Sequence, residues 1–169
     1  MAKSDSFFIR ATVSSNGGAF EQTSIDLGAY VDALGKSVLR VHNIAVQTLN
    51  NGVMGQDWSI PAGTQSNLSW QLTTQSQAAL VDATDKSVVA TGRLDIANNG
   101  SGAGYTFLSH DSDIMPQAWT QGYLIGVEQI YLGADADPQI ARADVVIVME
   151  CTVETLSQNA AMALALSQQ

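Results

Sequence analysis

The sequence predicts an all-β domain, and two observations carry this prediction. Clusters of glycine and polar residues divide the 169 residues into many short apolar runs, as turns divide the strands of a β-domain. Leu68, Trp70 and Leu72 alternate with polar neighbours, which is the period-two pattern of a strand with one buried face. The run 145–153 has an apolar residue at every odd position, so it predicts a longer strand of the same kind.

The other strands are expected in apolar runs bounded by turn-forming residues. These runs are 7–13, 20–27, 38–49, 88–96, 105–108 and 123–132. Within 38–49 the apolar side chains change face midway, so a β-bulge is expected near His42 and Asn43. Gly126 lies inside the run 123–132 and weakens a strand there unless another element packs closely on it.

The second face of the strand expected over 145–155 changes character along its length. Val146 and Val148 make this face apolar at first, and Thr152 and Glu154 then make it polar. We therefore expect the strand to begin buried on both sides and to end with one side in solvent.

The residues from 159 to 169 differ from the rest of the chain. They are mainly alanine, leucine and methionine without turn formers, so a helix is expected. An isolated helix of this length is marginal in water, so it needs a surface to lie on. We therefore predict a β-sandwich domain over 1–157 and a helical tail over 158–169 that packs on a neighbouring copy. The contact candidates in this tail are Met162, Leu164 and Leu166.

The number and length of the expected strands narrow the fold class. About seven to nine strands, joined in part by long loops, fit two stacked sheets better than an up-and-down barrel. The predicted fold is therefore a single jelly roll or antiparallel β-sandwich with a short C-terminal helical tail.

The chain is strongly acidic, with 7 Lys plus Arg against 16 Asp plus Glu and a net charge of −9. Its basic residues are scattered singly, whereas nucleic-acid binding needs grouped Lys and Arg, so direct binding to nucleic acid is not expected. No run of about 18 apolar residues occurs, so membrane insertion is not expected. The first residues lack the apolar stretch of a signal peptide, which predicts synthesis in a cytoplasm.

No residue is predicted to be catalytic. Nucleophilic catalysis needs a nucleophile, a base and an orienting group, and neither histidine, His42 nor His110, lies in such a pattern. Cys151 lies on the apolar face of a strand, where a cysteine behaves as a small hydrophobic residue. A metal-assisted hydrolase that uses His110, Asp111 and Asp113 is the least favoured of the functions considered.

Two Asp-x-Asp pairs are the candidate metal ligands. Asp111 pairs with Asp113, and Asp135 pairs with Asp137. Spaced aspartates in loops supply the oxygen ligands that Ca²⁺ takes, but the second pair lacks the glycine and the closing glutamate of an EF-hand loop. A solvated loop is the favoured interpretation, so no cofactor is predicted and Ca²⁺ is the alternative.

The three tryptophans lie in different contexts. Trp70 belongs to the predicted core, whereas Trp58 and Trp119 lie in predicted loops. Tryptophan is enriched in subunit contacts, so Trp58 and Trp119 are candidates for such contacts. In an alternative interpretation, both loop tryptophans form a sugar-binding platform together with the aspartate pairs at one end of the domain.

Several segments together resemble a known group of virus coat proteins. They are FFIRATV (7–13), SIDLG (24–28), LRVHNI (39–44), GYLIGV (122–127) and VVIVMEC (145–151). Their order and style are similar to the single jelly-roll coat proteins of small circular single-stranded DNA viruses, in particular smacovirus-like viruses associated with archaea. Such coats usually carry a basic amino-terminal arm, whereas only Lys3 and Arg10 precede residue 36 here. The resemblance implies self-assembly into a symmetric shell and carries over no site residue.

Two functions follow as hypotheses. The first is a structural protein that assembles with copies of itself, with a virus shell as the assembly, other virion proteins as further partners and the virion as the location. The second is a carbohydrate- or ligand-binding β-sandwich module of a surface or virion appendage. Neither hypothesis includes an enzymatic activity.

Overall fold

A computed structural model of the chain describes residues 4–32, 35–54, 58, 60–100, 105–109 and 113–169. The elements in chain order are β1 (Phe7–Ser15), β2 (Glu21–Asp26), β3 (Ser37–Asn50), β4 (Gln65–Thr73), β5 (Val88–Asn98), β6 (Tyr105–Ser109), the 3₁₀ helix η1 (Pro116–Ala118), β7 (Tyr123–Ile125), β8 (Gln129–Ala136), β9 (Ala143–Thr155) and α1 (Gln158–Ser167). No helix in these ranges has both the length and the apolar character that crossing a bilayer requires.

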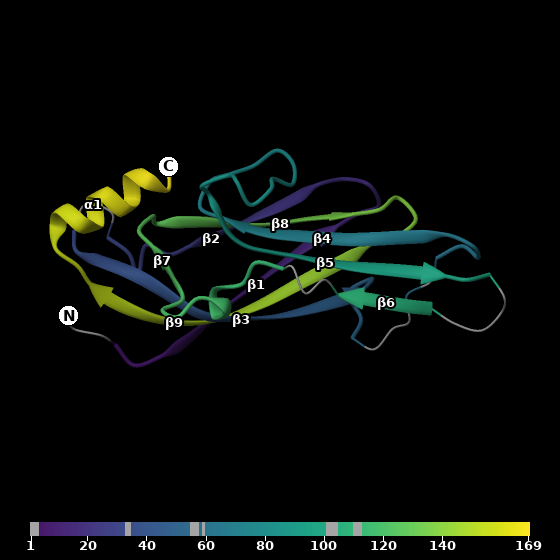
Figure 1. Cartoon of the computed structure of the whole chain (residues 1–169), viewed down its shortest axis with the longest axis horizontal. Helices are drawn as coiled ribbons and strands as arrows, with labels where there is room; N and C mark the ends of the chain where they lie inside the picture. The colour runs from purple at the N-terminus through teal and green to yellow at the C-terminus, as the bar shows by residue number, and fades with distance from the viewer. Residues whose placement is uncertain (1–3, 33–34, 55–57, 59, 101–104, 110–112) are drawn as a thin grey trace.

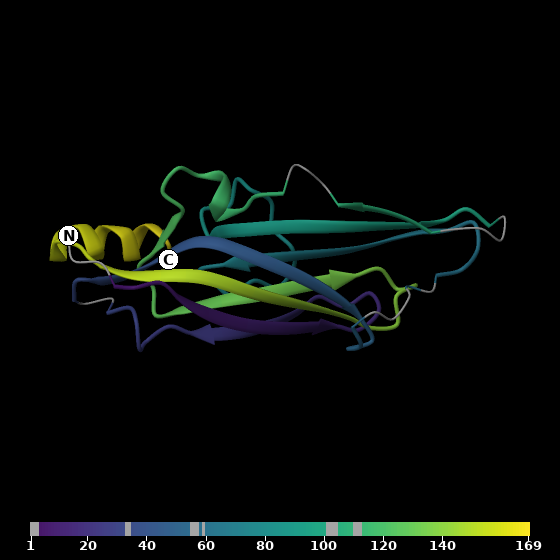
Figure 2. The same cartoon turned by 90° about the horizontal axis from the view of Figure 1, so that it is seen from below.

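The strands form two antiparallel sheets that lie face to face (Figures 1 and 2). The first sheet has the order β1-β9-β3-β7, and the second has the order β2-β8-β4-β5-β6. β6 adds a hairpin partner to the end of β5, and without it each sheet has four strands. The remaining eight strands form two interlocked Greek keys, which is the arrangement of a jelly roll. The fold class predicted from the sequence is therefore confirmed.

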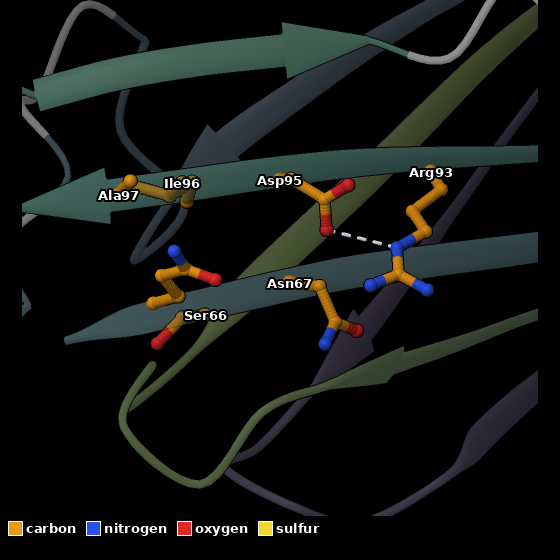
Figure 3. A pocket seen from close by; sticks show the side chains of 7 residues that line it. Ser66, Asn67, Arg93, Asp95, Ile96 and Ala97 are labelled. Atoms are coloured by element: carbon orange, nitrogen blue, oxygen red, sulfur yellow. Dashed lines mark hydrogen bonds and ion pairs between the residues drawn. The ribbon is translucent and has the colours of Figure 1, made fainter.

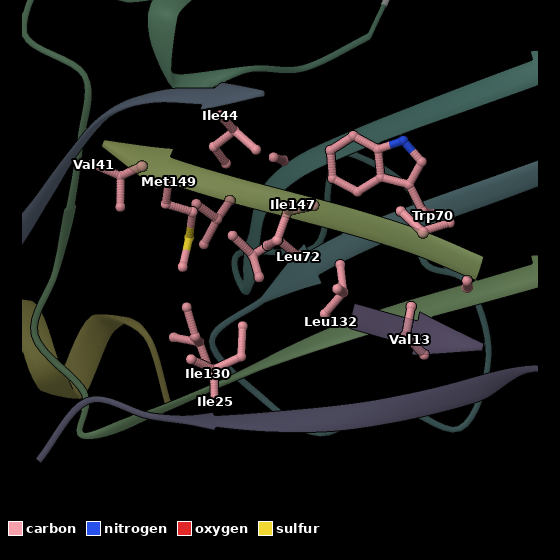
Figure 4. Close-up of a cluster of buried hydrophobic side chains, with 14 of the residues drawn as sticks. Val13, Ile25, Val41, Ile44, Trp70, Leu72, Ile130, Leu132, Ile147 and Met149 are labelled. Carbon is pink, nitrogen blue, oxygen red and sulfur yellow. The ribbon is translucent and has the colours of Figure 1, made fainter. Parts of the chain in front are cut away.

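The hydrophobic core lies between the two sheets (Figure 4). From the second sheet, Leu68, Trp70 and Leu72 point into it with at most 4% of their surface exposed. From the first sheet, Ile147 and Met149 contribute fully buried side chains. Both period-two patterns seen in the sequence are thus confirmed as strands with one face in the core.

β3 contains the predicted bulge. Its pairing with β9 shifts register between Val41 and Asn43, so His42 is the extra residue. The shift lets Val41 point into the core before the bulge and Ile44 after it. Nε2 of the His42 ring lies 2.9 Å from Oγ1 of Thr152 on β9.

The prediction of a single strand over 123–132 is wrong, because the two halves of this run belong to different sheets. β7 ends at Ile125 in the first sheet, and β8 begins at Gln129 in the second. Gly126 lies at the crossing, where a Cβ atom would lie 3.1 Å from the backbone nitrogen of Ala165 in α1. The close packing expected at Gly126 is therefore supplied by the helix, at the point where the chain leaves the first sheet.

The expectation that β9 ends with one face in solvent is also wrong. Thr152 and Glu154 are buried, whereas Val146 and Val148 on the same face are only half-buried. Glu154 is buried because Arg40 of β3 pairs with it, with Nε 2.6 Å from Oε1 and Nη2 2.7 Å from Oε2. The sequence pattern of β9 does not show this pairing, because the partner lies on another strand.

Residues 113–122 form a strap that links the edge of β5 to the edge of β3. The Thr91 N–H donates a hydrogen bond of 2.9 Å to the carbonyl oxygen of Ile114. The side-chain amide of Gln117 makes two hydrogen bonds of 3.1 Å, with the backbone N–H and the carbonyl oxygen of Ile44. The strap thus satisfies backbone groups that an open strand edge would offer to another chain.

Candidate functional site

The aspartates of one predicted pair of metal ligands, Asp135 and Asp137, lie at the end of β8 and in the turn after it. Asp135 lies in β8, not in the predicted loop, and pairs with Ser69 of β4. Asp137 lies in the turn that follows, where its Oδ1 accepts a hydrogen bond of 2.9 Å from the Gln139 N–H. Within the described residues, no group of three or more His, Cys, Asp or Glu side chains has the spacing to hold a metal ion.

The other aspartate pair lies only partly within the described residues. His110 and Asp111 lie outside them, whereas Asp113 is half-buried at the start of the strap. Asp113 lines a shallow hollow together with Asp82 and Arg93. Binding of Ca²⁺ by Asp111 and Asp113 stays an alternative to the expectation that the chain has no cofactor.

Cys151 is buried on the core side of β9. Its Sγ lies 3.7 Å from the carbonyl oxygen of Met149. Burial, together with the negative charge of Glu150, raises the pKa of the Cys151 thiol to about 12. Reactive cysteines have a lowered pKa and an accessible sulfur, so this thiol is part of the core rather than a nucleophile.

Cys151 is expected to resist thiol reagents in the folded protein. Ellman's reagent at about pH 8 should label almost none of the native chain, because the thiol is buried and protonated. The same reagent should label one thiol per chain after unfolding in guanidinium chloride, since Cys151 is the single cysteine. Because burial raises the folded-state pKa, stability should also fall as the pH rises from about 9 towards 12. Rapid labelling of the native protein would contradict the buried position.

A polar hollow of about 420 Å³ lies on the second sheet along β4 and β5 (Figure 3). Arg93 Nε and Asp95 Oδ1 pair there at 2.8 Å, and Asn67 lies beside them. The buried Ser66 hydroxyl has no hydrogen-bond partner among the described residues. None of the described residues that line this hollow is aromatic, so they provide no stacking surface for the ring of a sugar.

The structure places two of the three tryptophans in the core and the third at the surface. Trp70 is in the core as predicted, and Trp58 belongs to the core as well, with 9% of its surface exposed. Trp58 therefore offers little surface to another subunit, against the prediction from its loop context. Trp119 is 55% exposed in the strap and lines an apolar cavity of about 490 Å³ with Val88 and Tyr123. Trp58 is buried in the core, and none of the described residues that line the cavity at Trp119 is an aspartate, so the described residues do not bring together the sugar platform of the alternative interpretation.

α1 buries two of its alanines against the domain, while two of its larger apolar side chains are exposed to solvent. Ala161 and Ala165 are buried, whereas Met162 is 44% and Leu166 is 67% exposed. Leu164 is intermediate between them. This arrangement is the reverse of an ordinary surface helix, which buries its large apolar residues against the core.

Gln168 docks the end of α1 on its own domain. Its Oε1 accepts a hydrogen bond of 2.8 Å from the Gly126 N–H, and its Nε2 donates one of 2.7 Å to the Leu124 carbonyl oxygen. Its own carbonyl oxygen accepts a bond of 2.8 Å from Thr74 Oγ1. Figure 1 shows α1 at one end of the sandwich, close to β7. The predicted helix is confirmed, but its alanine side packs on its own domain. Contact with a neighbouring copy stays a prediction for the outward side alone.

The first sheet carries exposed apolar residues that the sequence alone did not single out. Phe8 on β1 is 57% exposed, and Val146 and Val148 on β9 are half-buried. The sequence of β1 contains one indication of this exposed residue. Phe7 and Phe8 are neighbours in a strand, so their side chains point to opposite faces of the sheet. A strand with two apolar faces is also typical of full burial, so only the structure shows that this face is open.

Comparison with known proteins gives matches in fold but none in sequence. The sequence matches no protein-family model and no curated protein. Among solved structures, the fold is similar to desmodium yellow mottle tymovirus, with a TM-score of 0.37 and 10% identity over 90% of this chain and 87% of that chain. It is also similar to an empty head of turnip yellow mosaic virus, with a TM-score of 0.28 and 10% identity over 90% and 82% of the two chains. A third structure, maize chlorotic mottle virus, has a TM-score of 0.34 and 8% identity over 90% and 95%.

Proposed function

We propose that this chain is a structural subunit that assembles with copies of itself into the shell of a virus particle. The observation that carries the proposal is the outward side of α1, where Met162 and Leu166 are exposed while the smaller Ala161 and Ala165 are buried against the domain. Full burial of a Leu or Met side chain stabilises a protein by about 1.5–3 kcal/mol, so a helix that served only its own domain would bury the larger residues. We therefore infer that a second copy covers Met162 and Leu166.

The distribution of exposed apolar residues supports a subunit with more than one neighbour. Leu166 lies on α1, Trp119 on the strap and Phe8 on β1, and each of them is more than half exposed. A jelly roll is used for virus shells, but also for lectin domains and cupins, so the fold by itself does not decide the function. Exposed apolar side chains at three separate places favour the shell, because a shell subunit contacts neighbours on several sides.

The charge of the chain adds to the proposal. A net charge of −9 with scattered basic residues favours a shell in which this subunit does not neutralise the genome itself. The proposed partners are copies of the chain together with other virion proteins, and the proposed location is the virion. The narrower resemblance to smacovirus-like coats stays a prediction. The proposal includes no enzymatic activity, cofactor or bound cation.

The substitution Leu166→Asp tests the proposal. Purified wild-type protein is expected to form particles that are visible by light scattering and by negative-stain microscopy. Leu166→Asp should abolish these particles, because a charged group would be buried at the contact without a partner. The fold should be retained, since a substitution at an exposed position usually changes stability by no more than about 0.5 kcal/mol.

Asn159→Asp is the matched control, because it adds the same charge at an exposed position of the same helix. This variant should assemble as the wild type does. A wild-type chain that remains monomeric at every concentration would overturn the proposed function. Normal assembly of Leu166→Asp would show that α1 is not part of the contact between copies.

A further inference from the structure

The outer side of the first sheet is divided into a covered part and an open part. Near α1, the outward side chains Arg40, Thr152 and Glu154 are buried. Beyond the bulge at His42, the outward side chains of β1 and β3 are exposed and those of β9 are half-buried. We call this part the open face. It consists of Phe8, Arg10, Thr12, Val146, Val148, Glu150, Asn43, Ala45 and Gln47.

The centre of the open face is apolar. Val146 and Val148 lie on β9, which has β1 on one side and β3 on the other. Across the three strands, Arg10 is opposite Val148, and Val148 is opposite Ala45. Phe8 adds an aromatic ring that is 57% exposed. A strand in solvent contact usually alternates apolar and polar residues, whereas β9 here carries valines on both faces.

The open face carries one charge of each sign, Arg10 and Glu150. Neither forms an ion pair within the described part of the chain, and the Arg10 guanidinium lies 5.9 Å from the centre of the Phe8 ring instead. The ladder places Phe8 opposite Glu150 and Arg10 opposite Val148, so these four residues are the corners of one cell of the β1–β9 ladder. The two charges occupy one diagonal of this cell, and the two apolar residues occupy the other.

We propose that the open face binds the open face of a second copy of this chain across a two-fold axis. An axis that runs along the Phe8–Val148 diagonal brings Arg10 of each copy opposite Glu150 of the other. Both ion pairs form at once, because a two-fold contact is reciprocal. The same axis brings Phe8 and Val148 against their own equivalents. This inference rests on the proposed function, since it assigns one of the contacts of the self-assembled subunit.

The charge of the whole chain favours this occupant over another surface of the same protein. Two copies with a net charge of −9 repel each other, so they approach most readily where the charges cancel. On the open face of one copy, the charges of Arg10 and Glu150 sum to zero. Between two copies, the positive charge of each Arg10 faces the negative charge of the other copy's Glu150. Three strands spaced about 4.8 Å apart present only a few hundred Å², less than the roughly 800 Å² per partner of a standard interface. The contact is therefore one of several that hold a subunit in its assembly.

Charge reversal tests the two-fold contact. Arg10→Glu and Glu150→Arg should each weaken self-association at least about tenfold, because like charges would face each other twice. An equimolar mixture of the two variants should associate again. In the mixed pair, the glutamates at positions 10 and 150 of one chain face the arginines at positions 150 and 10 of the other. Sedimentation velocity of each variant and of the mixture measures this, with circular dichroism to show that the chains are folded.

The ion pair of Arg93 and Asp95 provides the matched control, since it lies on the second sheet. Arg93→Glu and Asp95→Arg make the same charge changes and should leave association unchanged. Wild-type-like association of Arg10→Glu or Glu150→Arg would overturn the open face as a contact and leave the proposed function intact. Loss of association that the mixture does not restore would overturn the two-fold arrangement. A wild-type chain that never associates would overturn both proposals.

Discussion

Glu154→Ala is expected to lower the free energy of unfolding by about 3–5 kcal/mol, the range for removing one partner of a buried ion pair. The carboxylate accepts two hydrogen bonds from Arg40, at 2.6 and 2.7 Å. The third contact of the guanidinium, from Nη1 to the Gln121 carbonyl oxygen at 2.5 Å, does not neutralise its charge. The hydrogen bond to Glu154 raises the pKa of Arg40 above its ordinary value, so Arg40 is charged at every accessible pH. Without Glu154, a buried positive charge would remain unpaired.

Urea denaturation followed by far-ultraviolet circular dichroism measures this loss. Glu150→Ala is the control, because Glu150 lies on the same strand and the same face but is only half-buried. It should change the free energy of unfolding by less than about 0.5 kcal/mol. The double variant Arg40→Met, Glu154→Leu should recover most of the stability, since it removes both charges and retains the volume. A loss below about 1 kcal/mol for Glu154→Ala would show that water reaches the pair.

Trp70→Ala is expected to destabilise the fold by about 3–5 kcal/mol, the range for removing a large aromatic side chain from a core. Trp70 is 4% exposed and pairs across the second sheet with Gly92. A Cβ atom on Gly92 would lie 2.3 Å from the indole Nε1, so the ring occupies the space that a side chain would fill there. Alanine at position 70 would leave this space empty between the two sheets.

Trp119→Ala is the matched control, because it removes the same side chain from a position that is 55% exposed. Thermal unfolding monitored by circular dichroism avoids dependence on tryptophan fluorescence, which both variants change. Trp70→Ala should lower the melting temperature strongly, and Trp119→Ala should lower it only slightly. Equal losses for the two variants would contradict the burial of Trp70 in the core.

The parts of the fold that depend on local sequence pattern were predictable. The alternation around Trp70 shows a strand with one buried face, and the change of apolar face after Val41 shows where β3 has its bulge. These signals lie within a few residues of each other. The burial of Glu154 was not predictable from pattern, because it depends on Arg40, which lies 114 positions away in the chain. The division of 123–132 into two strands depends likewise on the distant packing of α1 on Gly126.

The candidate site was predictable only in part. The composition of the tail indicates a helix, but it favours burial of Leu166 and gives no reason for Ala165 to be the buried residue. The choice is made by Gly126, which lets the backbone of α1 approach closely, and by Gln168, which fixes the end of the helix. The sequence around Trp58 predicts a loop, whereas in the structure its side chain belongs to the core. Local pattern describes one strand or helix, whereas these positions are set by two or three elements together.

The ladder between β1 and β9 has a consequence for how the chain folds. Phe7 pairs with Cys151, so β1 completes its pairing only after β9 has been synthesised. Proteins of such high contact order fold slowly, because the entropy of closing a long loop is lost before the strand pairing stabilises the structure. During this interval both edges of β1 are unpaired, and Phe7 and Phe8 are exposed to other nascent chains. Synthesis at low temperature should therefore improve the yield of correctly folded protein, because hydrophobic association between unfinished chains weakens on cooling.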